Sequence, residues 1–176
     1  MSPSELAQAL RIVPASRADF DAVMQLLTEA RMWHIQNGLE VWKAFDPALI
    51  AADIEAGGIF VARLGDAVCG AVTLIEHDLR VWGTDQKQAL YVHRLVSSRQ
   101  TVGRGIGAAI LRWAQDVARQ RGKACLRLET WDTNRKLRAY YEKQGFRHIR
   151  DVFFPSDSPV PEDYRGTHKS LYELAL

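Results

Sequence analysis

The sequence predicts an α/β fold of the α+β type, in which helices flank a mixed, mostly antiparallel sheet with one parallel strand pair. Two apolar runs joined by Gly65-Asp66 form a hairpin pattern, which makes the early strands antiparallel. A strand–helix–strand pattern over residues 89–131 requires a parallel pair with a right-handed crossover. The 176 residues are enough for one full hydrophobic core, so we expect a single domain over residues 1–176.

Each element is expected from its own local pattern. Strands are expected where short apolar runs end at turn residues, which places them at residues 10–15, 59–64, 68–76, 89–97, 124–131, 146–153 and 168–174. Helices are expected where apolar residues keep helical spacing, over residues 17–33, 47–54, 106–119 and 134–144. Ser16 is a suitable cap for the first helix, and Pro47 opens the second. Polar loops are expected over residues 77–88 and 154–166.

The composition is that of an ordinary globular protein, with 47% hydrophobic and 25% charged residues. No apolar stretch approaches the length of about 18 residues that a membrane span needs, and the N-terminus lacks the pattern of a signal peptide. We therefore expect a cytoplasmic protein that does not bind a membrane. Cys69 and Cys125 stand in apolar runs without a CxxC pair, so we expect buried free thiols and no metal site.

Charge is distributed unevenly along the chain. Residues 1–93 carry 7 Lys/Arg against 12 Asp/Glu, residues 94–150 carry 14 against 4, and residues 151–176 carry 2 against 5. The basic block favours an anionic ligand near the middle of the chain, although solvated helix faces explain the individual charges equally well. Nucleic acid is not the expected partner, because no aromatic RNA-binding motif or helix-turn-helix pattern accompanies the block.

A glycine-rich turn lies between the strand expected over 89–97 and the helix expected over 106–119. Gly103, Gly105 and Gly107 allow positive φ and a close approach to the main chain, and the helix N-terminus favours an anion. This combination is typical of a pyrophosphate cradle. A P-loop is excluded because no Gly-Lys-Ser/Thr follows at the required spacing.

A dinucleotide-binding turn remains as an alternative. Gly103-x-Gly105-x-x-Ala108 fits the GxGxx(G/A) fingerprint, and Glu129 lies near the position of the acid that binds the ribose. However, only 47 residues follow Glu129, which leaves too little chain for further βαβ units. The hairpin upstream is also wrong for a first strand of such a fold.

Residues 91–146 resemble the GCN5-related N-acetyltransferase (GNAT) family. Residues 102–107 are similar to its R-G-x-G-I-G turn, and residues 134–146 are similar to its N-x-x-A-x-x-(L/F)-Y-x-x-x-G-F segment. Two positions depart from the pattern: Val102 stands where the family prefers Arg or Gln, and His93 where many members have Glu. The resemblance implies the GNAT-like acyl-CoA N-acyltransferase fold and acetyl-CoA as acetyl donor. It also implies direct attack by a primary amine of a small molecule or peptide, and leaves a homodimer as an option.

The resemblance also implies roles for particular residues. It implies a split between the strands expected at 89–97 and 124–131, which holds the pantetheine arm of acetyl-CoA. Residues expected to bind acetyl-CoA are Leu95, Val96, Ser97, Val102, Gly103, Arg104, Gly105, Ile106, Gly107, Ala108 and Asn134. Tyr141 matches the general acid that protonates the departing thiolate. His93 is our candidate for the base, because a histidine titrates near neutral pH.

The acceptor is expected to contact the first two helices and the loop after the third strand. Candidates for this contact are Trp33, His34, Trp42, Glu76 and Trp82. The acidic N-terminal half favours a cationic acceptor, although surface solvation explains the same charge. A non-catalytic acyl-CoA-binding module stays open as a second class of function, and Tyr141 argues against it.

Overall fold

The computed structural model describes residues 3–84 and 87–176, which form two compact units. The first unit contains the chain up to residue 74 together with residues 93–113, and the second contains residues 75–92 and 114–176. Two elements, β4 (Ala89–Ser97) and α5 (Ile106–Gln120), contribute residues to both units. Residues 85 and 86 of the loop expected over 77–88 lie outside the described part.

The strands of the first unit follow one another in the order β1-β2-β3-β4. β1 (Leu10–Pro14), β2 (Ile59–Leu64) and β3 (Ala67–Ile75) pair antiparallel. The turn between β2 and β3 takes a φ of 60° at Gly65, a conformation that glycine adopts without a steric cost. The predicted hairpin is therefore confirmed.

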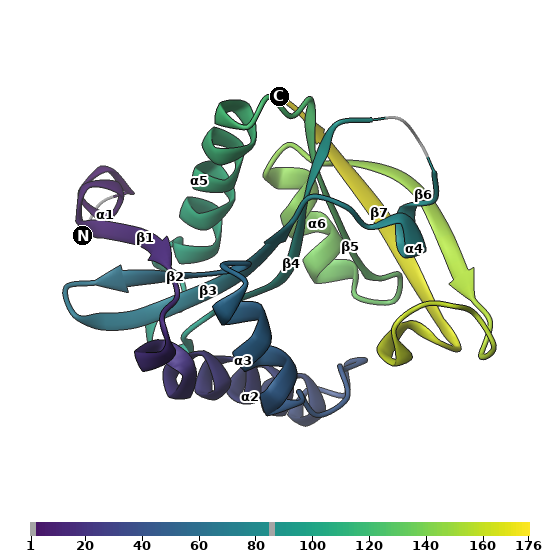
Figure 1. The fold of residues 1–176 in the computed structure, drawn as a ribbon, viewed down its shortest axis with the longest axis horizontal. Helices are drawn as coiled ribbons and strands as arrows, with labels where there is room; N and C mark the ends of the chain where they lie inside the picture. The colour runs from purple at the N-terminus through teal and green to yellow at the C-terminus, as the bar shows by residue number, and fades with distance from the viewer. Residues whose placement is uncertain (1–2, 85–86) are drawn as a thin grey trace. The chain divides into compact units, whose positions relative to one another are not determined.

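Two helices cover one face of these strands (Figure 1). α2 (Phe20–Gln36) follows a short 3₁₀ turn, η1 (Arg17–Asp19), which begins where Ser16 donates hydrogen bonds to the Asp19 carboxylate. α3 (Pro47–Glu55) is capped by Asp46, whose Oδ1 accepts from the Ala48 N–H at 2.9 Å. Their apolar side chains form a buried core with β2 and β3, which includes Val23, Leu27, Ile50, Ile54, Val61 and Ala71.

The first half of α5 covers the opposite face of β2 and β3 (Figure 1). Trp113 packs against Phe60 with ring centroids 4.9 Å apart. At Gly70 of β3, an added Cβ would lie only 2.9 Å from Ile110 Cδ1 and 3.1 Å from Ile106 Cγ2. A glycine at position 70 thus lets α5 pack directly onto the backbone of β3.

The second unit contains the parallel pair. Residues 89–91 of β4 pair parallel with residues 125–127 of β5 (Cys125–Trp131). β7 (Thr167–Ala175) lies antiparallel between β5 and β6 (Arg147–Phe154), so the order is β4-β5-β7-β6. The expected mixed, mostly antiparallel pairing with one parallel pair is confirmed.

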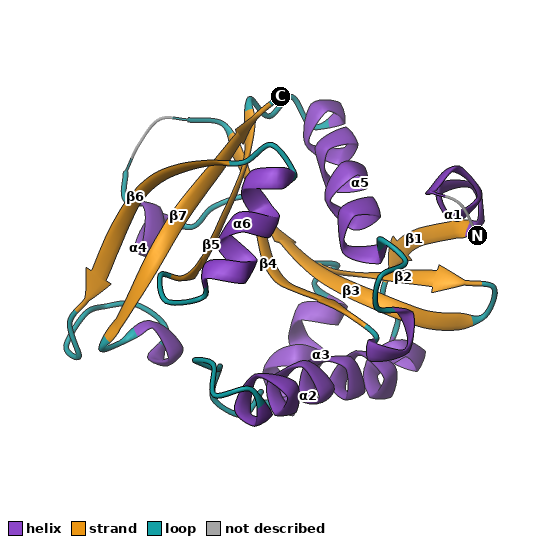
Figure 2. Ribbon diagram, turned by 180° about the vertical axis from the view of Figure 1, so that it is seen from behind, coloured by secondary structure: helices purple, strands orange, loops and turns teal. Residues whose placement is uncertain are grey.

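Helices lie on both faces of β5 and β7, with α6 (Arg135–Lys143) in front and α4 (Leu79–Trp82) behind in Figure 2. Tyr141 of α6 packs against Tyr172, whereas Trp82 of α4 belongs to the cluster that contains Leu171. Neighbouring residues of a strand point to opposite faces, so these contacts agree with the figure. A short turn, η3 (Glu162–Tyr164), packs on the Trp82 side through Tyr164.

Most predicted elements are confirmed within one or two residues. The main differences are four short elements that have no strong periodicity: α1 (Pro3–Ala9), α4, the turn η2 (Arg99–Thr101) and the turn η3. The first predicted helix also extends further, to Gln36, where Asn37 and Gly38 end it. In the described part of the chain, no helix is both long and apolar enough to cross a membrane.

Candidate functional site

The glycine turn consists of three consecutive backbone features: a 3₁₀ turn, two left-handed glycines and the start of a helix. Ser98 begins η2, and its Oγ accepts from the Gln100 N–H at 3.2 Å. Gly103 and Gly105 then both take a φ of 79°, which L side chains rarely adopt. α5 begins at Ile106, where the Gly105 carbonyl accepts the helical hydrogen bond of the Ala109 N–H at 3.0 Å.

This turn fits an anionic ligand. The N–H groups of Ile106, Gly107 and Ala108 have no partner within α5, because a helix leaves its first donors without one. Residues 102–105 are exposed, including the Arg104 side chain. Aligned N–H groups, the helix dipole and a nearby guanidinium all favour phosphate oxygens. A Cβ at Gly103 or Gly105 would strain the backbone, which explains why glycine stands at both positions.

β4 leads into this turn after its pairing with β5 has ended. The parallel register stops at Tyr91 and Arg127, although β4 continues to Ser97 and β5 to Trp131. The parallel register with β5 thus ends six residues before the end of β4. Leu95 and Ser97 are half-buried there, Val96 is buried, and His93 is half-buried within the first unit.

Tyr141 lies in the second unit, on the buried face of α6. Its side chain is 7% exposed, and its ring packs edge-on against Tyr140 and Phe146 and tilted against Tyr172. Burial, with smaller contributions from Tyr140 and Glu129, raises the pKa of the Tyr141 phenol well above its ordinary value of 10. The phenol therefore stays protonated throughout the physiological pH range and can act as a hydrogen-bond donor.

Asn134 is the N-cap of α6. Its Oδ1 accepts from the Leu137 N–H at 3.1 Å, and the residue is 8% exposed. Since the side-chain oxygen already serves the helix, Nδ2 is the atom best suited to contact a ligand.

Glu129 has surroundings that the sequence did not indicate. The Tyr164 hydroxyl donates a hydrogen bond to Glu129 Oε1, and the Glu129 charge contributes to the raised pKa of Tyr141. Glu129 lies on β5 two residues past Arg127, where the register with β4 ends, and it pairs there with Leu171 of β7. The sequence suggested only a ribose-binding acid at this position. Its partner Tyr164 is 35 residues away, so no local pattern could have identified the contact.

Three of the expected acceptor residues lie together in the first unit. His34 and Trp42 stack with centroids 5.3 Å apart, and Trp33 packs against His34 at 5.6 Å. His34 Nδ1 lies 3.1 Å from the Glu40 carbonyl oxygen, and burial lowers the pKa of this imidazole. The Arg99 guanidinium lies 4.5 Å from the Trp33 ring centroid, so this aromatic cluster is in contact with η2, next to the glycine turn.

The other two expected acceptor residues already have partners within the second unit. Both Glu76 carboxylate oxygens accept hydrogen bonds, one from Arg121 at 3.2 Å and one from Lys123 at 3.0 Å. Trp82 is 3% exposed and packs under the Arg127 guanidinium. These contacts give both side chains a structural role, so we do not extend the acceptor proposal to them.

The chain is similar to acetyltransferases in sequence. The profile of the Acetyltransferase (GNAT) family matches residues 20–146. The chain is 29% identical over 153 residues to the uncharacterized N-acetyltransferase YesJ of Bacillus subtilis, a match that covers 82% of this chain and 85% of the relative.

Solved structures of the same family share the fold. A GNAT-family acetyltransferase from Streptococcus agalactiae superposes with a TM-score of 0.76 at 22% identity, over 96% of each chain. A putative acetyltransferase of Salmonella typhimurium, yncA, solved with its cofactor acetyl-CoA, gives a TM-score of 0.67 at 18% identity, over 95% of this chain and 94% of that one. The acyl-CoA N-acyltransferase fold expected from the sequence is thus confirmed.

Proposed function

The chain belongs to the acetyltransferase (GNAT) family and is an N-acetyltransferase, and we propose that it transfers the acetyl group of acetyl-CoA to a primary amine of a small molecule or peptide by direct attack. The observation that carries the proposal is the exposed glycine turn at the start of α5, where two left-handed glycines precede the first N–H groups of the helix, which have no partner within α5. Members of this family use acetyl-CoA. The pyrophosphate of acetyl-CoA is the kind of anion that such a turn binds.

We assign the binding of acetyl-CoA to three segments. Residues 102–108 hold the pyrophosphate through main-chain N–H groups. The main chain of residues 95–97 binds the pantetheine arm and supplies an N–H to the thioester oxygen, where negative charge develops during attack. Asn134 contacts the arm through Nδ2.

The reaction needs two proton transfers. The attacking amine must lose a proton, because an alkylammonium with a pKa of about 10 is not nucleophilic. His93 is one candidate for this base, and Glu129 is a second, supported by its charge interaction with Tyr141. Tyr141 acts on the departing sulfur as the acid. Removing a well-placed acid or base lowers kcat about 10²–10⁴-fold.

The acceptor is an amine that is cationic in solution. Trp33, His34 and Trp42 are the proposed contacts, since aromatic rings attract an ammonium group and its alkyl chain. Trp33 and Trp42 are half-buried, and His34 is buried. A screen of candidate amines, in which the release of CoA is measured, would identify the acceptor.

Calorimetric titration with acetyl-CoA, CoA and NADPH tests the proposal. We expect binding of acetyl-CoA and CoA and no heat with NADPH. NADPH binding without acetyl-CoA binding would instead favour a dinucleotide site at the same turn. Acetyl-CoA binding without CoA release in the presence of any amine would favour a non-catalytic acyl-CoA-binding module.

A pair of glycine variants identifies the site. Gly105→Ala strains a residue of the turn with φ of 79°, and we expect it to weaken acetyl-CoA binding at least tenfold, about 1.4 kcal/mol. Gly65→Ala is the matched control, because Gly65 has a similar φ of 60° in the β2–β3 hairpin. Equal losses of affinity in both variants would contradict the assignment of the turn.

A further inference from the structure

One residue of β4 has an unusual backbone. Arg94 takes a φ of 48°, and it is the one non-glycine residue with positive φ among residues 3–84 and 87–176. This conformation is disfavoured for a residue with a Cβ and persists only where other contacts hold it. It also changes the direction of the neighbouring peptide groups, because a regular strand requires negative φ at every residue.

The contact that holds Arg94 comes from α3. Arg94 Nη1 donates to Asp53 Oδ2 at 2.5 Å, and both side chains are largely covered, with exposures of 24% and 30%. The two residues are 41 positions apart, so the ion pair ties β4 to a helix on one face of the first unit.

The Asp53 end of this contact is itself fixed. The Asp53 carbonyl accepts from the Gly58 N–H at 3.0 Å, and the Gly58 carbonyl accepts from the Leu74 N–H at 2.9 Å. Ile54, the neighbour of Asp53, is buried in the core of the unit. The carboxylate is therefore held on a rigid support rather than on a mobile loop.

We propose that the Asp53–Arg94 ion pair is a positioning device, which holds the left-handed backbone at Arg94 and thereby sets the direction of the N–H groups of residues 95–97 toward the acetyl donor. The second part of this inference, that the N–H groups of residues 95–97 point toward the acetyl donor, rests on the proposed function, which assigns those groups to the pantetheine arm and the thioester oxygen. Asp53 is a positioning residue in this scheme, because it acts through the backbone of β4 and does not touch the substrate.

The first test is amide hydrogen exchange in the ligand-free protein, followed residue by residue. In Asp53→Ala we expect the amides of residues 95–97 to exchange roughly tenfold faster than in the wild type, as the local conformation loses its support. Asp53→Asn, which keeps the size of the side chain and removes its charge, is the second variant in case Asp53→Ala folds poorly. Unchanged exchange at residues 95–97 in a folded variant would overturn the proposal.

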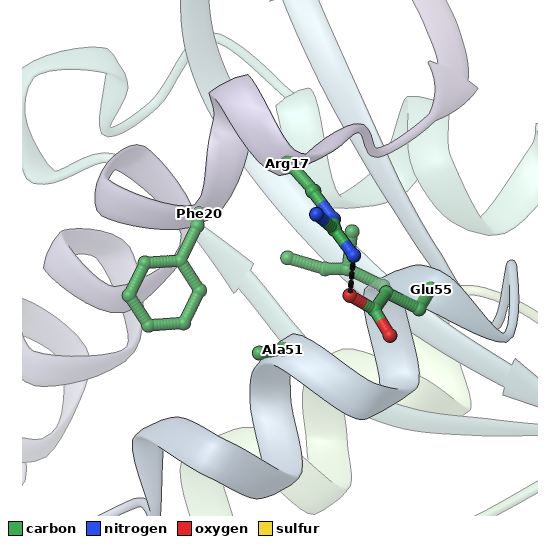
Figure 3. A pocket seen from close by; sticks show the side chains of 5 residues that line it. Arg17, Phe20, Ala51 and Glu55 are labelled. Atoms are coloured by element: carbon green, nitrogen blue, oxygen red, sulfur yellow. Dashed lines mark hydrogen bonds and ion pairs between the residues drawn. The ribbon is translucent and has the colours of Figure 1, made fainter.

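Glu55→Ala is the matched control. Glu55 lies on the same helix and also forms an ion pair, with Arg17 at 2.5 Å, across a shallow pocket of about 240 Å³ (Figure 3). That pair joins α3 to η1 rather than to β4. We expect Glu55→Ala to leave both the exchange of residues 95–97 and the Kd of acetyl-CoA unchanged.

A double-mutant cycle then tests whether Asp53 affects acetyl-CoA binding through the backbone conformation of Arg94. Glycine adopts positive φ freely, so Arg94→Gly no longer needs the ion pair. We expect Asp53→Ala to raise the Kd of acetyl-CoA roughly tenfold in the wild type and less than about twofold in the Arg94→Gly background. Equal losses in both backgrounds would show that Asp53 acts by another route. If the wild type binds no acetyl-CoA, the proposed function fails, and the exchange experiment still decides whether the ion pair holds β4.

Discussion

Gly70→Ala is the substitution whose effect is best defined by the geometry. The new methyl group would meet Ile110 Cδ1 at 2.9 Å, Ile106 Cγ2 at 3.1 Å and the Val96 carbonyl oxygen at 3.1 Å. Ile106 and Ile110 are 2% and 0% exposed, so neither side chain has free space to enter, and the carbonyl belongs to the backbone of β4. The clash must therefore be relieved by shifts of both α5 and the backbone of β4.

The cost of this movement is about 2–3 kcal/mol, the upper part of the range for overpacking a core. For a chain of this size, that cost lowers Tm by roughly 4–12 °C. Because Ile106 is the first residue of α5, the displacement also reaches the glycine turn. We expect weaker acetyl-CoA binding in Gly70→Ala, even at temperatures where the variant is fully folded.

Denaturant unfolding and calorimetry measure the two effects, with Gly58→Ala as control. A Cβ at Gly58 would meet only the Asp53 and Leu74 carbonyl oxygens, at 3.5 and 3.8 Å, which is ordinary van der Waals contact. We expect this variant to match the wild type, or to gain about 0.4–1 kcal/mol from a less flexible unfolded chain. Equal unfolding midpoints for the two variants would refute the close packing of α5 on β3.

Three further predictions concern the second unit. Tyr141→Phe is expected to lower kcat about 10²-fold with an unchanged Kd for acetyl-CoA, whereas Tyr140→Phe retains kcat, and equal turnover in both variants would remove the acid assignment. Asn134→Ala should lose about 1 kcal/mol of stability with the helix cap, and Asn134→Ser should restore stability; if Asn134 also binds the pantetheine arm, Asn134→Ser will not restore affinity. Burial acts to raise the pKa of Glu173, but hydrogen bonds from Lys87 and Arg127 outweigh it and hold the pKa below the ordinary 4.5. The stability from this carboxylate is therefore present above pH 4.5 and lost as the pH falls through the lowered pKa. Glu173→Gln should flatten that acid slope in pH-dependent unfolding and destabilise the protein at pH 7 by about 3–5 kcal/mol, since the buried Arg127 loses the negative charge of Glu173; an unchanged slope would contradict the role of Glu173.

The strands and the glycine turn could be predicted because their signals are local. Residues 59–64 and 89–97 are apolar runs that end at turn or polar residues, and both strands have the predicted bounds. The glycine turn combines a strand end, positive-φ residues and a helix start within ten residues, so its conformation follows from nearby sequence. α4 could not be predicted, since four residues contain too little of a helical period.

The contacts around the site could not be predicted, because they join residues far apart in the chain. Asp53 and Arg94 are 41 positions apart, and Glu129 and Tyr164 are 35 apart. Gly70 lies in a strand whose sequence does not distinguish it from any other glycine, and only the packing of α5 explains it. Glu76 is a further example: its charge suggested an acceptor contact, and the sequence did not indicate its ion pairs with Arg121 and Lys123, which are 45 and 47 positions away.

The raised pKa of Tyr141 constrains how this residue acts on the departing sulfur. A phenol with a pKa of about 10 is already a weaker acid than a thiol near 8.5, so complete transfer to a thiolate is uphill by about 2 kcal/mol. Burial raises the pKa of Tyr141 further, which increases that cost. Donation is therefore favourable only if the phenolic oxygen regains a proton in the same step, and the proton that the attacking amine loses is the available source. It follows that the kcat–pH profile rises with deprotonation of the amine or its base and shows no fall from Tyr141 ionisation up to about pH 10.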